Sequence, residues 1–337
     1  MKQYFLPSIK FLIFLGLGAL LSWLAISGIT EKDKIDIIKS LKEANYIWVV
    51  LAMLVGVFAH LSRAARWKML FAPLGLTPKF STTFYAVMIG YLGNLALPRL
   101  GEILRCGILK RYEKIPFTQS FGTVIAERII DVIVMLILFS ISIWMEYKRM
   151  YSYISENIFN PLKLKLNLLV ENKTTFFLLM GIVFIGVLLF FVLRKKIFQN
   201  TIVKKIRKVL LSFLEGIKSV TKVKDPLLFI FHSFFIWAMY FLSVYLCVFT
   251  FSDTRTMTIG DCLVIMAFGS LGVIATPGGI GAYQWIVLQI MLSWGFTVAA
   301  GVAFGWVVWL SQTVLILFLG FLSFGLLAIN NRKNFKI

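Results

Sequence analysis

The chain has 337 residues, of which 59% are hydrophobic and 15% aromatic, and Lys and Arg outnumber Asp and Glu by 35 to 15. No soluble domain can bury so large an apolar fraction, so a polytopic integral membrane protein is indicated. The basic excess does not indicate nucleic-acid binding, because the Lys and Arg residues cluster between apolar runs, as the positive-inside rule requires.

Apolar runs of roughly 18–20 residues or more, long enough to cross a hydrocarbon core of about 30 Å, recur along the chain. The first is too long for a signal-peptide core of about 7–15 residues, so we expect it to be an anchor. The spans expected in chain order are 9–29, 46–63, 121–145, 174–193, 226–251 and 303–329.

The segment 80–97 is apolar enough to span, but charge counting argues against a full crossing. If it crossed, the connection 194–225, with ten Lys or Arg, would face outward and violate the positive-inside rule. If it returns to its own side, 24 basic residues face the cytoplasm, four of them in a connection at 63–79, and ten face outward. We therefore expect a re-entrant hairpin, with both termini on the cytoplasmic side of the inner (cytoplasmic) membrane.

Residues 202–220 alternate apolar and basic positions at helical spacing. This pattern predicts an amphipathic helix in the membrane interface, on the cytoplasmic side. Anchoring and orientation are its favoured role, with recognition of a lipid headgroup as the alternative.

An internal repeat follows from the segments 90–98 and 269–277, which both read GxLGxxAxP and lie 179 residues apart. The same shift carries 46–63 onto 225–242 and 120–145 onto 299–324. An odd number of full spans in the first half would insert the second half in the opposite orientation. The expected fold is therefore all-α, with about six full spans and two re-entrant hairpins. These form a single membrane domain made of two inverted repeats, 1–150 and 151–337.

Proline and glycine mark the turns of the two hairpins, since proline interrupts helices and glycine permits tight turns. Irregular backbone at membrane depth must line a cavity or be packed inside protein. The alternative use of these small residues is close helix packing. The turn residues are Pro98, Gly101, Pro277, Gly278, Gly279 and Gly281.

Three charged residues, Glu127, Arg128 and Asp131, lie within the span 121–145, with Asp131 about 15 Å from its start. Charges at this depth are costly unless paired or hydrated, and Arg128 can pair with Asp131 three residues away. We therefore expect Arg128 to contact a carboxylate, which is Asp131, Glu127 or a residue of another helix. A functional site is favoured. A salt-bridged helix contact and proton coupling through a carboxylate are the alternatives.

A second charged group lies beside the first hairpin and contains Arg99, Glu102 and Arg105. Guanidinium groups suit phosphate recognition because each can donate two parallel charged hydrogen bonds. We therefore expect the two arginines to bind a lipid phosphate near the mouth of the hairpin.

Nothing in the sequence indicates a metal, a cofactor or a catalytic motif. The cysteines, Cys106, Cys247 and Cys262, and the two histidines, His60 and His232, have no metal-ligand spacing. No nucleophile arrangement, P-loop or dinucleotide fingerprint occurs in a suitable context. A non-enzymatic role is expected, while acid–base chemistry by carboxylates in a membrane-embedded, lipid-modifying enzyme is the alternative.

The motifs taken together resemble a known family. Pro98-Arg99-Leu100-Gly101-Glu102 with Arg105, then Glu127-Arg128 with Asp131, then Pro277-Gly278-Gly279-Ile280-Gly281 are similar to the transmembrane region of lysylphosphatidylglycerol synthases and to the wider flippase-like (UPF0104-type) membrane proteins.

The resemblance implies a lipid-translocating module, with the polar site at Arg99, Glu102, Arg105, Glu127, Arg128 and Asp131. The family often has Glu shortly after the glycine-rich turn, where this chain has Gln284. The soluble aminoacyl-transferase domain of the full synthases is not recognisable here, so we expect no lysyl transfer by this chain alone.

These observations favour a translocator of an anionic or zwitterionic lipid, or of a lipid-linked sugar, whose headgroup passes between the two hairpins. The expected partners are membrane lipids, and the sequence does not indicate the cargo, the direction or the oligomeric state. A small-solute transporter or scaffold is a further alternative, and a lateral opening between helices would favour lipid over solute.

Overall fold

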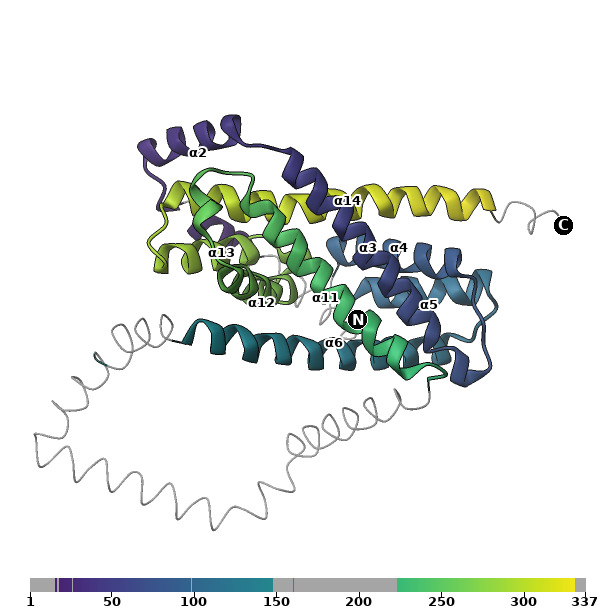
Figure 1. Ribbon diagram of the computed structural model, residues 1–337. Coiled ribbons are helices and arrows are strands. Elements are labelled where there is room, and N and C mark those ends of the chain that lie inside the picture. Colours follow the sequence, from purple (N-terminus) through teal and green to yellow (C-terminus); the bar gives the residue numbers. More distant parts are fainter. Residues whose placement is uncertain are drawn as a thin grey trace, which may run out of the picture. The chain divides into compact units, whose positions relative to one another are not determined.

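The computed structural model describes residues 16–147 apart from 17, 26 and 98, then residue 160 and residues 223–330. Every regular element in this part of the chain is a helix, with no strand (Figure 1). The expected span 174–193, the amphipathic helix expected at 202–220, Pro98 and both termini lie outside the described residues.

The helices before the first long gap are α2 (Glu31–Glu43), α3 (Ile47–Met69), η1 (Ala72–Leu74), α4 (Phe80–Ala96), α5 (Leu100–Tyr112) and α6 (Phe117–Met145), where η marks a 3₁₀ helix. A helical segment at 18–25 precedes them. Those of the last part are α11 (Pro226–Val248), η3 (Asp253–Thr256), α12 (Ile259–Ala275), η4 (Pro277–Gly279), α13 (Ala282–Ser293) and α14 (Val298–Asn330).

Three described helical stretches are long and apolar enough to cross a membrane: Ile47–Leu74, Pro226–Val248 and Val298–Asn330. They coincide with three of the predicted spans, and α6 covers a fourth. The helical fold and its membrane-spanning character are therefore as the apolar runs predicted.

Local sequence explains where several helices begin. The hydroxyl of Thr30 accepts from the backbone N–H of Asp33, whose carboxylate accepts in return from the N–H of Thr30, a capping box that starts α2. Thr258 and Asp261 repeat this arrangement at α12. Helix α11 begins with Pro226, which needs no intrahelical hydrogen-bond partner at the first position.

Helix α3 corrects the boundary expected from the sequence. It continues to Met69 instead of ending at residue 63, so Arg63 and Arg66 lie inside a helix and are buried. The charge count had assigned both to a cytoplasmic connection. They are held instead by carboxylates of α6, so that connection is shorter and carries two fewer topogenic charges.

The expected repeat is visible in the helix bounds. Shifting α3 by 179 residues gives the bounds of α11, and shifting α4 by the same number gives those of α12. Helices α3 and α11 pack side by side and antiparallel (Figure 1): the backbone N–H of Asn45 donates to the carbonyl of Thr250 at one end, and Ser62 bonds His232 at the other. Helix α14 packs against both α4 and α13.

Candidate functional site

The first broken helix pair, α4 and α5, is held together by glycines. A methyl group at Gly101 would collide with the carbonyl oxygen of Gly90, and one at Gly93 would lie 2.6 Å from a methyl carbon of Leu104. Asn94 joins the two helices across the break, because its side-chain oxygen accepts a hydrogen bond from the backbone N–H of Gly101 at 2.8 Å. Gly101 is thus required for close approach of the two helices.

The second broken pair, α12 and α13, repeats this packing 179 residues later. A methyl group at Gly272 would lie 2.8 Å from the backbone nitrogen of Tyr283, whose position corresponds to Leu104 in the first pair. Trp309 of α14 fixes the break by donating its indole N–H to the carbonyl of Gly278 at 2.8 Å. The small residues therefore have both expected uses: they permit turns and they permit close packing.

The two breaks also share a backbone conformation. Leu97 and Thr276 are both extended, and two residues later Arg99 (φ 67, ψ 4) and Gly278 (φ 62, ψ 10) are both left-handed. Glycine adopts this conformation freely, whereas another residue pays roughly 1–2 kcal/mol. Arg99 therefore occupies a position where glycine would be less strained.

The breaks lie close together. A methyl group at Gly278 would be 2.7 Å from Cδ2 of Leu95, which lies near the end of α4. Gly281, just after the second break, packs against Gly18 and Ser22 of the first described helical segment. The two interruptions of the helices are therefore in contact with each other.

Five buried side chains form a charged cluster next to the first break: Arg63 and Arg66 of α3, Arg105 of α5, and Glu127 and Asp131 of α6. Glu127 accepts from Arg63 at 2.9 Å and from Arg105 at 2.6 Å. Asp131 accepts from Arg63 and from Arg66, each at 2.6 Å. Each carboxylate thus accepts hydrogen bonds from two guanidinium groups, the guanidinium of Arg66 also lies 3.6 Å from Glu127, and three helices are tied together.

The cluster carries one positive charge in excess, since three arginines face two carboxylates. In addition, the buried Nε of each of these guanidinium groups has no hydrogen-bond partner among the described residues. Aromatic rings cover the arginines, the closest contact being Arg105 over Trp67 at 4.0 Å. Arg66 also donates to the hydroxyl of Ser233 at 3.2 Å, so the excess charge is only partly compensated by neutral groups.

Arg128 pairs with a carboxylate of another helix, which is one of the expected alternatives. Its guanidinium donates to Glu102 of α5 at 2.7 Å, and no bond to Asp131, three residues away, is formed. Asp131 lies on the face of α6 that meets α3, whereas the Arg128 side chain is 45% exposed and that of Glu102 is 19% exposed. The Arg128–Glu102 pair therefore lies at the accessible edge of the site.

The two arginines expected to bind a phosphate together lie in different environments. Arg105 is buried and bound to Glu127, while Arg99 is exposed and makes no ion pair with any described residue. In this conformation only Arg99 is free to meet a ligand.

Gln284 in α13 occupies the position that corresponds to Arg105 by the shift of 179 residues. It is 2% exposed, and neither its amide oxygen nor its amide nitrogen has a partner among the described residues. Buried amides are normally hydrogen-bonded, so this one is a polar position open to water or ligand. The second half therefore places a neutral group where the first half has a cation.

The sequence interpretation missed Arg63 and Arg66 as site residues. The signal was present, because arginines three residues apart lie on one face of a helix and His60 and Trp67 extend that face. No group of His, Cys, Asp and Glu in the described part of the chain could hold a metal ion. The three cysteines are buried and unpaired.

Comparison with known proteins identifies relatives. The family described as the lysylphosphatidylglycerol synthase TM region matches residues 9–320. The UPF0104 membrane protein MJ1595 of Methanocaldococcus jannaschii is 34% identical over 116 residues, which are 34% of this chain and 34% of that protein. The UPF0104 membrane protein MJ1078 of the same organism is 25% identical over 201 residues, 60% of this chain and 79% of that protein.

The chain thus aligns with only about a third of the length of the first of these relatives. No solved structure matches the chain.

Proposed function

The chain belongs to the family of lysylphosphatidylglycerol synthase transmembrane regions, and on this basis we propose that it carries a lipid headgroup across the membrane without modifying it. The cargo is an anionic or zwitterionic phospholipid or a lipid-linked sugar. The headgroup passes along the meeting breaks of the two helix pairs while the acyl chains stay in the surrounding lipid. The contact between Leu95 and Gly278 is the observation that carries this proposal.

Broken helices that meet inside a bundle are a means of making a polar site at membrane depth. Helices α4 and α12 have 17 residues each, about 25 Å at 1.5 Å per residue, and are shorter than a hydrocarbon core of about 30 Å. Each pair also folds back on itself, with Gly93 against Leu104 and Gly272 against Tyr283, so we assign each pair to a re-entrant hairpin that enters and leaves on one side.

The antiparallel packing of α3 and α11 supports an inverted repeat. These helices correspond by the shift of 179 residues, so two equivalent spans that run in opposite directions imply halves of opposite orientation. The hairpins then open toward opposite sides of the membrane, which is the geometry of alternating access. We assign both termini to the cytoplasmic side of the inner membrane.

The charges support an anionic group in the cargo. Arg99 is exposed at the first break, and the Arg128–Glu102 pair lies at the accessible edge, so these residues contact the headgroup first. The excess cation of the charged cluster then attracts the phosphate. Among the described residues, arginines are the ion-pair partners of Glu127 and Asp131, an arrangement suited to holding arginines and less suited to acid–base catalysis.

The test is reconstitution of the purified chain into liposomes with labelled lipids of several headgroups, with leaflet exchange and chemical modification of the lipid measured together. We expect exchange without modification. Modified lipid would favour the membrane-embedded enzyme, and uptake of a water-soluble solute without lipid exchange would favour the small-solute transporter.

A further inference from the structure

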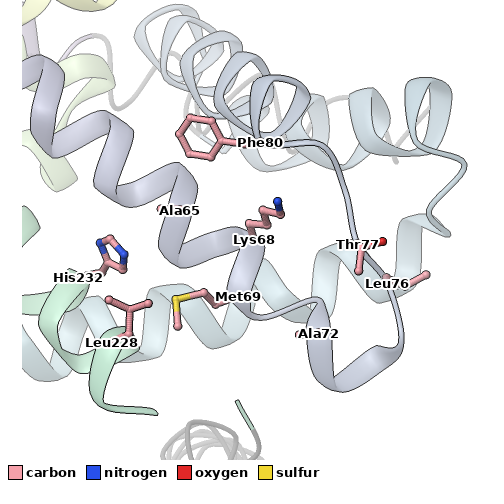
Figure 2. Close-up of a pocket in the computed structure, with 9 residues that line it drawn as sticks. All are labelled: Ala65, Lys68, Met69, Ala72, Leu76, Thr77, Phe80, Leu228 and His232. Carbon is pink, nitrogen blue, oxygen red and sulfur yellow. The ribbon is translucent and has the colours of Figure 1, made fainter. Parts of the chain in front are cut away.

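A separate cavity lies at the end of two candidate spans, where the last turns of α3 meet the first turns of α11 and α4. Its volume is about 260 Å³, larger than the roughly 150 Å³ that accommodates benzene in an engineered apolar cavity. Figure 2 shows Leu228 and His232 at one end of the lining and Leu76 and Thr77 at the other. The remaining lining residues are Ala65, Lys68, Met69, Ala72 and Phe80.

The wall is almost entirely apolar, although three of the lining residues, Lys68, Thr77 and His232, carry polar side-chain groups. Lys68 is half-buried and forms no ion pair with any residue the structure describes. Nδ1 of His232 is hydrogen-bonded to the hydroxyl of Ser62 at 2.8 Å, and Nε2 takes no part in that bond. The lining contains no carboxylate, and Asp225, the acidic residue before α11, is not part of it.

This cavity is distinct from the charged cluster. Arg63 and Arg66 extend from α3 toward the carboxylates of α6, whereas Ala65, Lys68 and Met69 of the same helix line the cavity. A ligand can therefore occupy the cavity without displacing any ion pair of the cluster.

We propose that this cavity binds an anionic phospholipid of the surrounding bilayer, with one acyl chain between Phe80, Met69 and Leu228 and the phosphate at the amine of Lys68. An apolar space of this size suits a hydrocarbon chain, and a lone cation without a carboxylate suits an anion. The position also fits, because lysines near the ends of spans extend their amines toward the lipid headgroups. The site holds a lipid in place and does not require that lipid to move between leaflets.

The test uses the full chain in nanodiscs of phosphatidylcholine that contain a phosphatidylglycerol with a photoreactive diazirine on one acyl chain. Peptide mapping after illumination should find the label within 65–80 and 228–232. A diazirine-bearing phosphatidylcholine should label these peptides less. Lys68→Gln should lower phosphatidylglycerol labelling about fivefold, because a lysine near an anionic lipid surface contributes about that factor.

Two further variants sharpen the result. Lys68→Arg should retain labelling, and Lys110→Gln, which removes an exposed lysine of α5, is the matched control and should leave labelling unchanged. Ala65→Phe should fill the cavity and reduce labelling by either probe, with size-exclusion chromatography as the folding check. Equal labelling by the two lipids, equal effects of Lys68→Gln and Lys110→Gln, or labels confined to other peptides would overturn the proposal. Because leaflet exchange is not measured here, failure of the proposed translocation leaves this result unaffected.

Discussion

Replacing Glu127 by Gln should destabilise the protein strongly, because Glu127 is fully buried and bridges two arginines. It accepts from Arg63 at 2.9 Å and from Arg105 at 2.6 Å. Glutamine has nearly the same shape but no charge, and its amide nitrogen cannot accept a hydrogen bond. The substitution therefore leaves one guanidinium without its acceptor and raises the excess charge of the cluster from one to two.

The magnitude follows from the burial of the cluster. Removing one partner of a buried ion pair costs about 3–5 kcal/mol, because the remaining charge is left uncompensated. At roughly 2–4 °C per kcal/mol for a domain of a few hundred residues, the melting temperature should fall by about 6–20 °C. Adding Arg105→Gln returns the excess to one charge, so the double variant should lose less stability than the sum of the two single variants.

The assay is thermal unfolding of the detergent-purified variants. The folded fraction that remains after heating is measured by fluorescence-detected size-exclusion chromatography. Glu31→Gln is the control, because the Glu31–Lys34 pair of α2 is also 2.6 Å long but its side chains are 85% and 53% exposed. Exposed pairs contribute about 0–1 kcal/mol, so this variant should melt close to the parent. If Glu127→Gln and Glu31→Gln melted at the same temperature, the cluster would not hold the three helices together.

Further predictions concern the packing and the caps. Gly101→Ala should destabilise the protein by about 1–3 kcal/mol in thermal unfolding, because the added methyl group has no space. Gly107→Ala is the control and should not destabilise it, because nothing lies within 4 Å of the new carbon. Equal effects of the two variants would contradict the close approach of α4 and α5. The double variant Leu95→Cys, Gly278→Cys, in a background without the native cysteines, should form a disulfide on mild oxidation. The disulfide would appear as a mobility shift that reductant reverses. Two thiols that stay free would argue against the contact of the breaks. The hydrogen bond from the Thr30 side chain lowers the pKa of Asp33. The Asp33 carboxylate therefore stabilises the start of α2 at a pH above its unfolded pKa of about 3.9, and this contribution is lost as the pH falls through the lower folded pKa. Amide exchange that showed no extra fraying of α2 in acid would refute this.

The three candidate spans that the structure describes and the position of the breaks could be predicted from the sequence, because both depend on local properties. A long apolar run must cross or be buried, and Pro277 with its following glycines interrupts a helix wherever it lies. The shift of 179 residues was likewise visible in a short motif, and it extends to helix bounds and to the conformations of Arg99 and Gly278.

The pairing of charges could not be predicted, because it depends on which helices pack against α6. From the sequence, Asp131 was within reach of Arg128 on its own helix, but the packing of α3 and α5 supplies other partners to both. Arg63 and Arg66 were hidden for a related reason: basic residues near the end of a span usually signal orientation, and only the tertiary contacts reveal that these two are buried. The unpaired amide of Gln284 is visible only in the packed structure.

Leaflet exchange of a labelled anionic phospholipid by the parent and by Arg99→Gly, both in proteoliposomes, tests the translocation proposal most directly. The substitution relieves a left-handed arginine and should leave stability equal or slightly higher, since the gain of roughly 1–2 kcal/mol is partly offset by the flexibility of glycine. Losing one charged hydrogen bond of about 1.5–3 kcal/mol should nevertheless slow exchange about ten- to a hundredfold, provided that the bond lowers the barrier to movement. The proposal predicts a parent that exchanges lipid much faster than protein-free liposomes and a stable variant that is slow. A well-folded parent that exchanges lipid no faster than protein-free liposomes would contradict it.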